Sequence, residues 1–146
     1  AGRATLLIEL KSHFDGDRRL VQRSADVLAN YRGPVAVMSF DPAMIEVVRW
    51  IAPHLTRGIV AERHYAHQEW DRFPRAEKRS LAMFLPAGRT RPQFLAYGIK
   101  DLPAAAPLVA RLVFRLPLLT WTVRSEADRR TAARWADQMI FEDLRP

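Results

Sequence analysis

The sequence predicts an α/β fold in which strands alternate with helices. Six short apolar runs typical of strands are separated by segments with helical hydrophobic spacing, and neither an internal repeat nor a low-complexity linker interrupts this pattern. A strand, a helix and a second strand in succession form a right-handed crossover unit, which makes the strands parallel. The alternation by itself allows either a closed barrel or an open doubly wound sheet.

The composition is that of a single globular domain with a sizeable core. The chain has 146 residues, of which 49% are hydrophobic, and it contains no cysteine. The lack of cysteine excludes disulfides and thiolate metal sites, and it favours a reducing, cytoplasmic location. No apolar run reaches the roughly 18 residues that a membrane span needs. The chain begins only a few residues before a strand of the buried type, so we expect the sequence to be truncated at its amino-terminus. A signal sequence upstream of this start stays possible.

The formal net charge of +7 favours anionic partners such as phosphate esters, acidic lipid head groups or nucleic acid. The basic residues occur as single residues and pairs, as in Arg18-Arg19, Lys78-Arg79 and Arg129-Arg130. No cluster of five or more is present, so charge alone does not predict a nucleic-acid groove. We expect most of these side chains to lie on a solvated surface.

The first strand, predicted over 6–11, carries two charged residues near its end. Because side chains alternate between the faces of a strand, Glu9 and Lys11 point to the same side. A run this apolar predicts a strand buried on both faces, where a charge is costly unless it meets a metal, a counter-charge or a ligand. Two interpretations stay open: an ion pair that only neutralises itself, and a functional site.

A helix is predicted over 16–31, followed by a second strand over 35–42. The helix has one apolar stripe, formed by Leu20, Val21, Ala25, Leu28 and Tyr31. After the strand, Asp41 is the expected N-cap of another helix, with Pro42 at its first position. The expected buried side of that second helix is Met44, Ile45, Val48 and Ile51.

The second half of the chain repeats the alternation. Strands are predicted over 58–62, 94–99, 118–123 and 139–142, and helices over 75–84, 104–115 and 126–135. The expected buried residues of the first two of these helices are Leu81, Phe84 and Leu85, then Leu108, Leu112 and Val113. Ser125 is the expected N-cap of the last helix, with Asp128 three residues later in an arrangement similar to a capping box.

His64 and His67 lie in a polar and aromatic stretch after the third predicted strand. In a barrel this stretch would be a loop on the face where such enzymes hold their sites. Histidines are common metal ligands, but two histidines three residues apart in a loop are more typical of surface residues. Both interpretations stay open.

Four short motifs occur in the order seen in the glycerophosphodiester phosphodiesterase family, and the sequence resembles that family. The motifs are Ile8-Glu9-Leu10-Lys11, Ser39-Phe40-Asp41, Trp121-Thr122-Val123 and Ile140-Phe141-Glu142-Asp143. The resemblance implies a (β/α)₈ TIM barrel, which takes about 250 residues when it is complete. Residues 1–146 would then form a single partial TIM-barrel domain, the carboxyl-terminal part of an incomplete barrel with about six strand–helix units.

The resemblance also implies roles for three residues. In the family, the Glu of the Glu-x-Lys strand is a ligand of a divalent metal and the Lys lies close to the phosphate, and these roles fall to Glu9 and Lys11. Ca²⁺ or Mg²⁺ is the implied cofactor, since hard cations prefer carboxylate oxygen. The family's Trp lines the substrate pocket, which would make Trp121 a substrate-binding residue; the alternative is a plain core tryptophan.

The sequence departs from the family pattern in several places. Arg124 stands where Asn is common after Trp-Thr-Val, and Glu142 stands where Thr is usual in the last motif. The family's amino-terminal His-Arg-Gly run, its Glu-x-Asp pair and its second His have no counterpart, and none of the four histidines matches them. We therefore predict no catalytic residue in this chain and expect the acid/base histidines upstream of it.

The sequence thus predicts the carboxyl-terminal portion of a metal-dependent phosphodiesterase that hydrolyses glycerophosphodiesters to glycerol 3-phosphate and an alcohol. The expected partner is the small-molecule substrate, without nucleic acid or a membrane span. The isolated chain is expected to be inactive and to pair with the missing amino-terminal part or with itself, because an incomplete barrel leaves sheet edges unpaired. Two alternatives stay open: a non-catalytic module that binds an anionic ligand or nucleic acid through its basic surface, and an enzyme of another barrel family.

Overall fold

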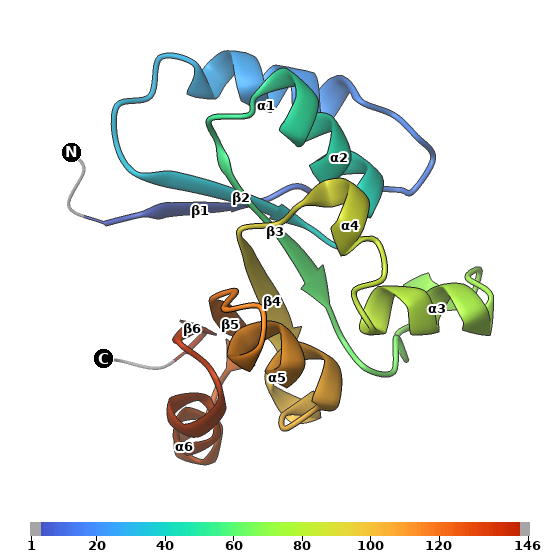
Figure 1. The fold of residues 1–146 in the computed structure, drawn as a ribbon, viewed down its shortest axis with the longest axis vertical. Helices are drawn as coiled ribbons and strands as arrows, with labels where there is room; N and C mark the ends of the chain where they lie inside the picture. The colour runs from blue at the N-terminus through green and yellow to red at the C-terminus, as the bar shows by residue number, and fades with distance from the viewer. Residues whose placement is uncertain (1–3, 144–146) are drawn as a thin grey trace. The chain divides into compact units, whose positions relative to one another are not determined.

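The structure, a computed structural model, describes residues 4–143 as two compact units. The first unit comprises residues up to 60 together with 86–93, and the second comprises 61–85 together with 94–143. Each unit is built from parallel strands that alternate with helices (Figure 1). Within each unit, strands that are consecutive in the chain are neighbours in the sheet. The predicted alternation of parallel strands and helices is therefore confirmed.

The first unit has two helices packed on a parallel sheet. Its elements are β1 (Leu6–Glu9), α1 (Arg19–Leu28), β2 (Val35–Ser39), α2 (Pro42–Ile51), β3 (Thr56–Ala61) and α4 (Ala87–Thr90). β2 pairs in parallel with β1 on one side and with β3 on the other. The helices meet the sheet at one cluster of buried residues, made of Leu10, Val21, Leu28, Val37, Met44, Val48, Ala52 and Leu55.

Helix α2 begins as the sequence predicts. Asp41 is its N-cap, with an extended backbone and a side-chain Oδ1 that accepts a hydrogen bond from the Ala43 N–H at 2.8 Å. Pro42 follows at the first helical position, where its lack of an N–H costs nothing. Ser39 ends β2 two residues earlier, so the strand, the cap and the helix form one tight turn.

The predicted apolar stripes of α1 and α2 are confirmed only in part. Val21 and Leu28, two helical turns apart, are buried. Leu20 is 43% exposed, because it lies one residue around the helix from that narrow seam, and Tyr31 is 39% exposed, because α1 already ends at Leu28. In α2 the last residue of the stripe, Ile51, is 41% exposed.

Strand β1 is less buried than its apolar sequence predicts. Leu6 is 43% exposed, whereas Leu10, just beyond the strand, is 3% exposed. Among the strands of residues 4–143, β1 pairs only with β2, so its other edge has no strand beside it. The prediction of a strand buried on both faces was therefore wrong at the start of β1.

The second unit contains three parallel strands with helices between them. Its elements are η1 (Gln68–Trp70), α3 (Arg75–Ala82), β4 (Phe94–Gly98), η2 (Ile99–Asp101), α5 (Ala105–Leu112), β5 (Leu118–Val123), α6 (Glu126–Trp135) and β6 (Gln138–Phe141). β5 pairs in parallel with both β4 and β6. Among the helices in residues 4–143, none has the length and apolar character that a membrane crossing requires.

In the second unit, α5 buries a different face from the predicted one, and the prediction for α3 is confirmed in part. Leu112 and Val113 are 69% and 68% exposed, and the buried residues of α5 are Pro107 and Ala110. Near α3, Leu85 is 70% exposed, while Leu81 and Phe84 are buried as predicted.

The predicted cap of α6 is confirmed. Ser125 is its N-cap, and its Oγ accepts a hydrogen bond from the Asp128 N–H at 3.1 Å. The Asp128 carboxylate reaches back one residue further than in a capping box, to the Arg124 N–H at 3.3 Å. It also accepts a hydrogen bond of 2.7 Å from the Lys100 ammonium, which lowers the pKa of Asp128.

Candidate functional site

Glu9 and Lys11 form an ion pair at the carboxyl end of β1. Glu9 is the last residue of the strand, and its Oε1 lies 2.7 Å from the Lys11 Nζ. The Lys11 side chain is 80% exposed, whereas that of Glu9 is 26% exposed. The two charges therefore lie on the same side, as the strand alternation predicts. The lysine is the part of the pair that solvent, or a ligand, reaches first.

The buried oxygen of Glu9 has a charge partner but no hydrogen bond. Although Lys11 lies close to Oε1, the approach lacks the direction of a hydrogen bond, and no other group within residues 4–143 supplies one. Such an oxygen is suited to a non-directional partner such as a hard cation. Residues 4–143 hold no group of three or more histidine or carboxylate side chains that could bind a metal. Glu9 therefore fits a metal as one ligand among several, and the described residues do not complete the set.

A polar network fixes the backbone next to this pair. The Ser39 hydroxyl donates a hydrogen bond of 2.7 Å to the carbonyl of Leu10, which lies between the two charged residues. Ser12 in turn donates a hydrogen bond of 2.6 Å to the Oδ2 of Asp41, the N-cap of α2. The carboxyl ends of β1 and β2 are thus tied together on either side of Lys11. These two hydrogen bonds give a structural role to Ser39 and Asp41 of the Ser-Phe-Asp motif, which begins at the last residue of β2.

Trp121 lies in β5, in the second unit. It is half-buried in β5 and is paired in register with Gly98, the last residue of β4. A Cβ on Gly98 would lie 3.9 Å from the Trp121 Cζ2 and 3.3 Å from the Asp101 Oδ2. The indole therefore covers the carboxyl end of β4. The structure brings Glu9 and Lys11 together and places Trp121 in the other unit.

Two further acidic residues lie near Gly98. The Cβ of Glu62 is 3.7 Å from the position that a Cβ on Gly98 would take. Burial raises the pKa of Glu62, against the opposing effect of His67, and its Oε1 is buried without a hydrogen bond. The Asp101 carboxylate accepts a hydrogen bond of 2.7 Å from the Arg63 N–H. Neither acid was singled out from the sequence.

His64 lies on the surface, close to one of these acids. Its side chain is 70% exposed, and its Nε2 is 3.9 Å from the Asp101 Oδ1. His67 is exposed as well. Among residues 4–143, the two histidines do not join a group of three possible metal ligands. The interpretation of the pair as surface residues is the one that agrees with this geometry.

Arg124 and Glu142, the two residues that depart from the family's motifs, contact each other. The Arg124 guanidinium donates to the Glu142 Oε2 through Nε, at 2.9 Å, and through Nη2. Arg124 directly follows β5 and Glu142 directly follows β6. The side chains are 61% and 55% exposed. The cation that replaces Asn is therefore neutralised by the acid that replaces Thr.

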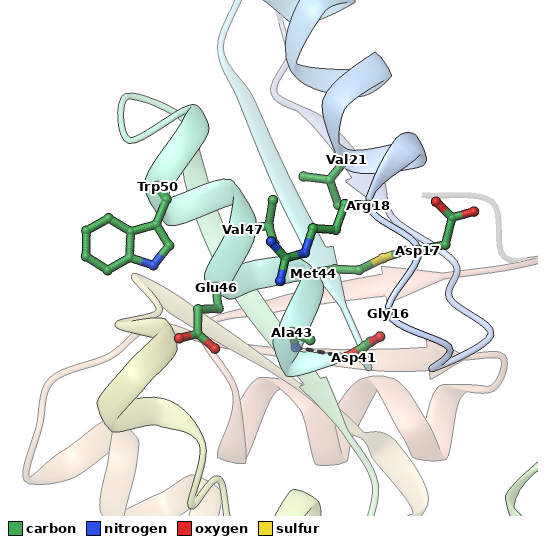
Figure 2. Close-up of a pocket in the computed structure, with 10 residues that line it drawn as sticks. All are labelled: Gly16, Asp17, Arg18, Val21, Asp41, Ala43, Met44, Glu46, Val47 and Trp50. Atoms are coloured by element: carbon green, nitrogen blue, oxygen red, sulfur yellow. Dashed lines mark hydrogen bonds between the residues drawn. The ribbon is translucent and has the colours of Figure 1, made fainter.

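Each unit also contains a cavity. The first, of about 300 Å³, lies between the segment before α1 and helix α2, and three of its lining residues are carboxylates: Asp17, Asp41 and Glu46. Figure 2 shows Arg18 extending from the α1 side toward α2, and the dashed hydrogen bond from Ala43 to Asp41. Because Asp41 is already engaged as a cap, and because acidic groups outnumber the single arginine, this cavity is poorly suited to an anion.

The second cavity, of about 540 Å³, lies in the second unit and is basic. We call it the basic pocket. Its lining residues are Arg63, His64, Arg75, Lys78, Arg79, Ala82, Met83, Tyr97, Pro103, Ala104, Ala105 and Ala106. Neither this cavity nor the first is lined by Glu9, Lys11 or Trp121. The sequence offers no distinct signal for it, because Lys78-Arg79 resembles the other basic pairs of the chain.

Comparisons with known proteins identify the fold. No protein-family model matches the sequence, and neither does any curated protein. A glycerophosphoryl diester phosphodiesterase of Silicibacter pomeroyi matches with 24% identity and a TM-score of 0.68, over 94% of this chain and 46% of its own. A glycerophosphodiester phosphodiesterase of Galdieria sulphuraria matches with 14% identity and a TM-score of 0.69, over 94% and 53%.

A third solved structure is similar in the same way. It is an Oleispira antarctica phosphodiesterase in complex with the product sn-glycerol-3-phosphate, with 14% identity and a TM-score of 0.65, over 94% of this chain and 51% of its own. The chain thus spans about half the length of the solved structures that it matches. Its fold is that of part of the (β/α)₈ barrel of glycerophosphodiester phosphodiesterases, which agrees with the resemblance of the four motifs.

Proposed function

We propose that this chain supplies part of the active site of a metal-dependent phosphodiesterase that cleaves glycerophosphodiesters to glycerol 3-phosphate and an alcohol. The observation that carries the proposal is the Glu9–Lys11 pair, whose buried carboxylate oxygen has no hydrogen bond, at the carboxyl end of the first strand. In barrels of parallel strands, active sites lie at that end of the strands. The similar phosphodiesterase with bound sn-glycerol-3-phosphate supports the choice of product.

The proposal gives each of the two residues a separate task. Glu9 would hold a divalent cation, Ca²⁺ or Mg²⁺, as one of its oxygen ligands. When bound, the cation would stabilise negative charge on the phosphodiester oxygens. Lys11 is exposed and reaches the same side, so its ammonium would bind and orient the phosphate. Trp121 would line the substrate pocket through the apolar face of its indole.

The described residues do not account for the whole reaction. Proton transfer to the leaving alcohol needs a general acid, and among residues 4–143 no histidine joins Glu9 in a group of three or more possible metal ligands. We infer that the acid/base groups and the remaining metal ligands come from a part of the protein outside this sequence. The half-length match to the solved phosphodiesterases is consistent with that inference.

The test is hydrolysis by the protein as its gene encodes it, followed as glycerol 3-phosphate released from a glycerophosphodiester with Mg²⁺ or Ca²⁺. Glu9→Gln should abolish the metal-dependent rate and leave the circular dichroism spectrum unchanged. Glu69→Gln, a matched change at an exposed position, should keep full activity. Undiminished turnover by Glu9→Gln would contradict the assignment.

Lys11 is tested in the same assay. A hydrogen bond between charged groups contributes roughly 1.5–3 kcal/mol, so Lys11→Ala should lower kcat/KM about 10- to 100-fold, mainly through KM. Lys11→Arg keeps the charge and should recover part of the loss. Unchanged kcat and KM for Lys11→Ala would show that the lysine does not engage the phosphate.

A further inference from the structure

The basic pocket of the second unit combines a cationic wall with an apolar one. Helix α3 and the turn after β3 supply the cations, and the stretch from Pro103 to Ala106 supplies a wall of small apolar residues. Its volume of about 540 Å³ lies within the range typical of small-molecule sites. The two walls suit a ligand that has an anionic end and an apolar end.

The cations of the pocket converge because of their spacing on α3. Arg75, Lys78 and Arg79 are three and four residues apart, so they share one face of the helix. Ala82 and Met83 continue this face by one more turn and end the charged part. Arg63 adds a fourth permanent positive charge from the turn after β3. Arg63, Arg75 and Arg79 are exposed and Lys78 is partly buried, so the charge lies along the accessible rim of the cavity.

No acidic side chain lines this pocket. Among residues 4–143, no carboxylate lies within ion-pair distance of Arg63, Arg75, Lys78 or Arg79. Lys78 is partly buried and donates a hydrogen bond of 3.1 Å to the Tyr65 carbonyl, which is a neutral partner. Four like charges around one cavity repel one another, and a bound anion would relieve that repulsion.

Two hydrogen-bond donors add to the cations. Tyr97 is only 2% exposed and lines the pocket, where its hydroxyl is a possible donor. Burial, helped by the Asp101 charge, raises the pKa of Tyr97 to about 12, so the hydroxyl keeps its proton. The N-terminus of α5 also lines the pocket, and its N-cap, Ala104, has no side chain that could cap the first amides.

We propose that the basic pocket binds the phosphate group of a small organic phosphate monoester. The arginine forks and uncapped helix amides match phosphate oxygens, and the organic part of the ligand lies against Met83 and the Pro103–Ala106 wall. The phosphodiesterase proposal gives no task to these lining residues, since none of them is Glu9, Lys11 or Trp121.

Isothermal titration calorimetry with phenyl phosphate tests the proposal, at low ionic strength and with EDTA to remove divalent cations. Phenyl phosphate should bind saturably and more tightly than inorganic phosphate, since its ring adds contact with the apolar wall. Phenol alone should not bind. Arg79→Gln should weaken binding about 10- to 100-fold, the range for one hydrogen bond between charged groups. Tyr97→Phe, which removes only the hydroxyl, should weaken it about 10-fold.

Matched controls separate a specific site from general attraction. Arg130→Gln removes the same charge from an exposed position of α6 in the same unit, and it should change the affinity less than about twofold. Lys11→Ala and Glu9→Gln should leave binding intact, which keeps a failure of this proposal distinct from a failure of the phosphodiesterase proposal. Equal weakening by Arg130→Gln and Arg79→Gln would overturn it.

Vesicles that contain phosphatidic acid distinguish the source of the phosphate. Sedimentation with such vesicles that depends on Arg79, and that phenyl phosphate competes away, would assign the group to a lipid head group. Binding of phenyl phosphate without vesicle binding would assign it to a soluble metabolite. The absence of saturable binding to both probes would overturn the proposal, as would binding only to a single-stranded oligonucleotide.

Discussion

Glu62, at the carboxyl end of β3, carries a carboxylate that is held partly out of water. Burial is the largest cause of its raised pKa, and one of its oxygens has no hydrogen bond. When the pKa in the folded state is above that of the unfolded chain, the folded state binds more protons in the interval between the two values. The free energy of unfolding therefore falls as the pH rises through that interval.

This sign gives a prediction for Glu62→Gln, which removes the charge and keeps the shape. The urea midpoint of the variant should exceed that of the wild type at about pH 8, and the difference should shrink towards about pH 3, where the carboxyl is mostly protonated in both states. Glu77→Gln, at an exposed position of α3, serves as the control. A variant that is equally destabilised at both pH values would show that the amide packs badly.

Among single residues, the sequence predicts the helix caps well. Asp41 before Pro42 and Ser125 three residues before Asp128 are local signals, since each cap and its amide partner are close in the chain. The basic pocket, in contrast, is lined by residues that are far apart in the sequence. The pair Lys78-Arg79 is indistinguishable in sequence from other surface pairs, and only the fold brings Arg63 and Tyr97 to the same cavity.

The carboxyl ends of β5 and β6 are joined by the Arg124–Glu142 ion pair. We expect a small coupling, because both side chains are more than half exposed. A double-mutant cycle with Arg124→Asn and Glu142→Thr should give a coupling free energy of about 0.2–1 kcal/mol that decreases at high salt. Urea denaturation of the four proteins measures it. Strictly additive changes would mean that the pair contributes nothing to stability.

Helix α5 shows where element-level prediction fails. Its sequence is apolar almost all round, so hydrophobic periodicity has little contrast with which to choose a face. The predicted face held Leu112 and Val113, whereas packing selected Pro107 and Ala110. In α2 the contrast is better, and the predicted Met44, Ile45 and Val48 are all buried. Strand boundaries were predicted to within a few residues, since apolar runs end at Gly, Pro or charged residues.

The chain as a whole is predicted to be inactive by itself. Glu9 and Lys11 supply a metal ligand and a phosphate contact, but loss of general acid/base groups alone typically costs ~10²–10⁴-fold in rate. A hydrolysis assay of the purified chain with Mg²⁺ or Ca²⁺ is the measurement. Robust metal-dependent turnover would mean that catalytic residues lie within these 146 residues and have been misassigned.

The same sample should self-associate in light scattering. Among the strands of residues 4–143, β6 pairs only with β5, and it exposes Phe141 at 50% and Met139 at 36%. An edge strand with apolar side chains favours pairing with another chain. Phe141→Lys should reduce the association, whereas Val27→Lys, a similar change on the exposed side of α1, should not. A monomeric wild-type chain would contradict this expectation.

In each unit the strands lie in the sheet in the same order as in the chain, which affects how the chain folds during synthesis. β1 pairs with β2 and β2 with β3, so every ladder of the first unit joins segments that leave the ribosome one after the other. The same holds for β4, β5 and β6. No strand of either ladder waits for a distant part of the chain, which keeps the entropy of loop closure low. Each ladder can therefore form during synthesis, strand by strand, before the rest of the polypeptide exists.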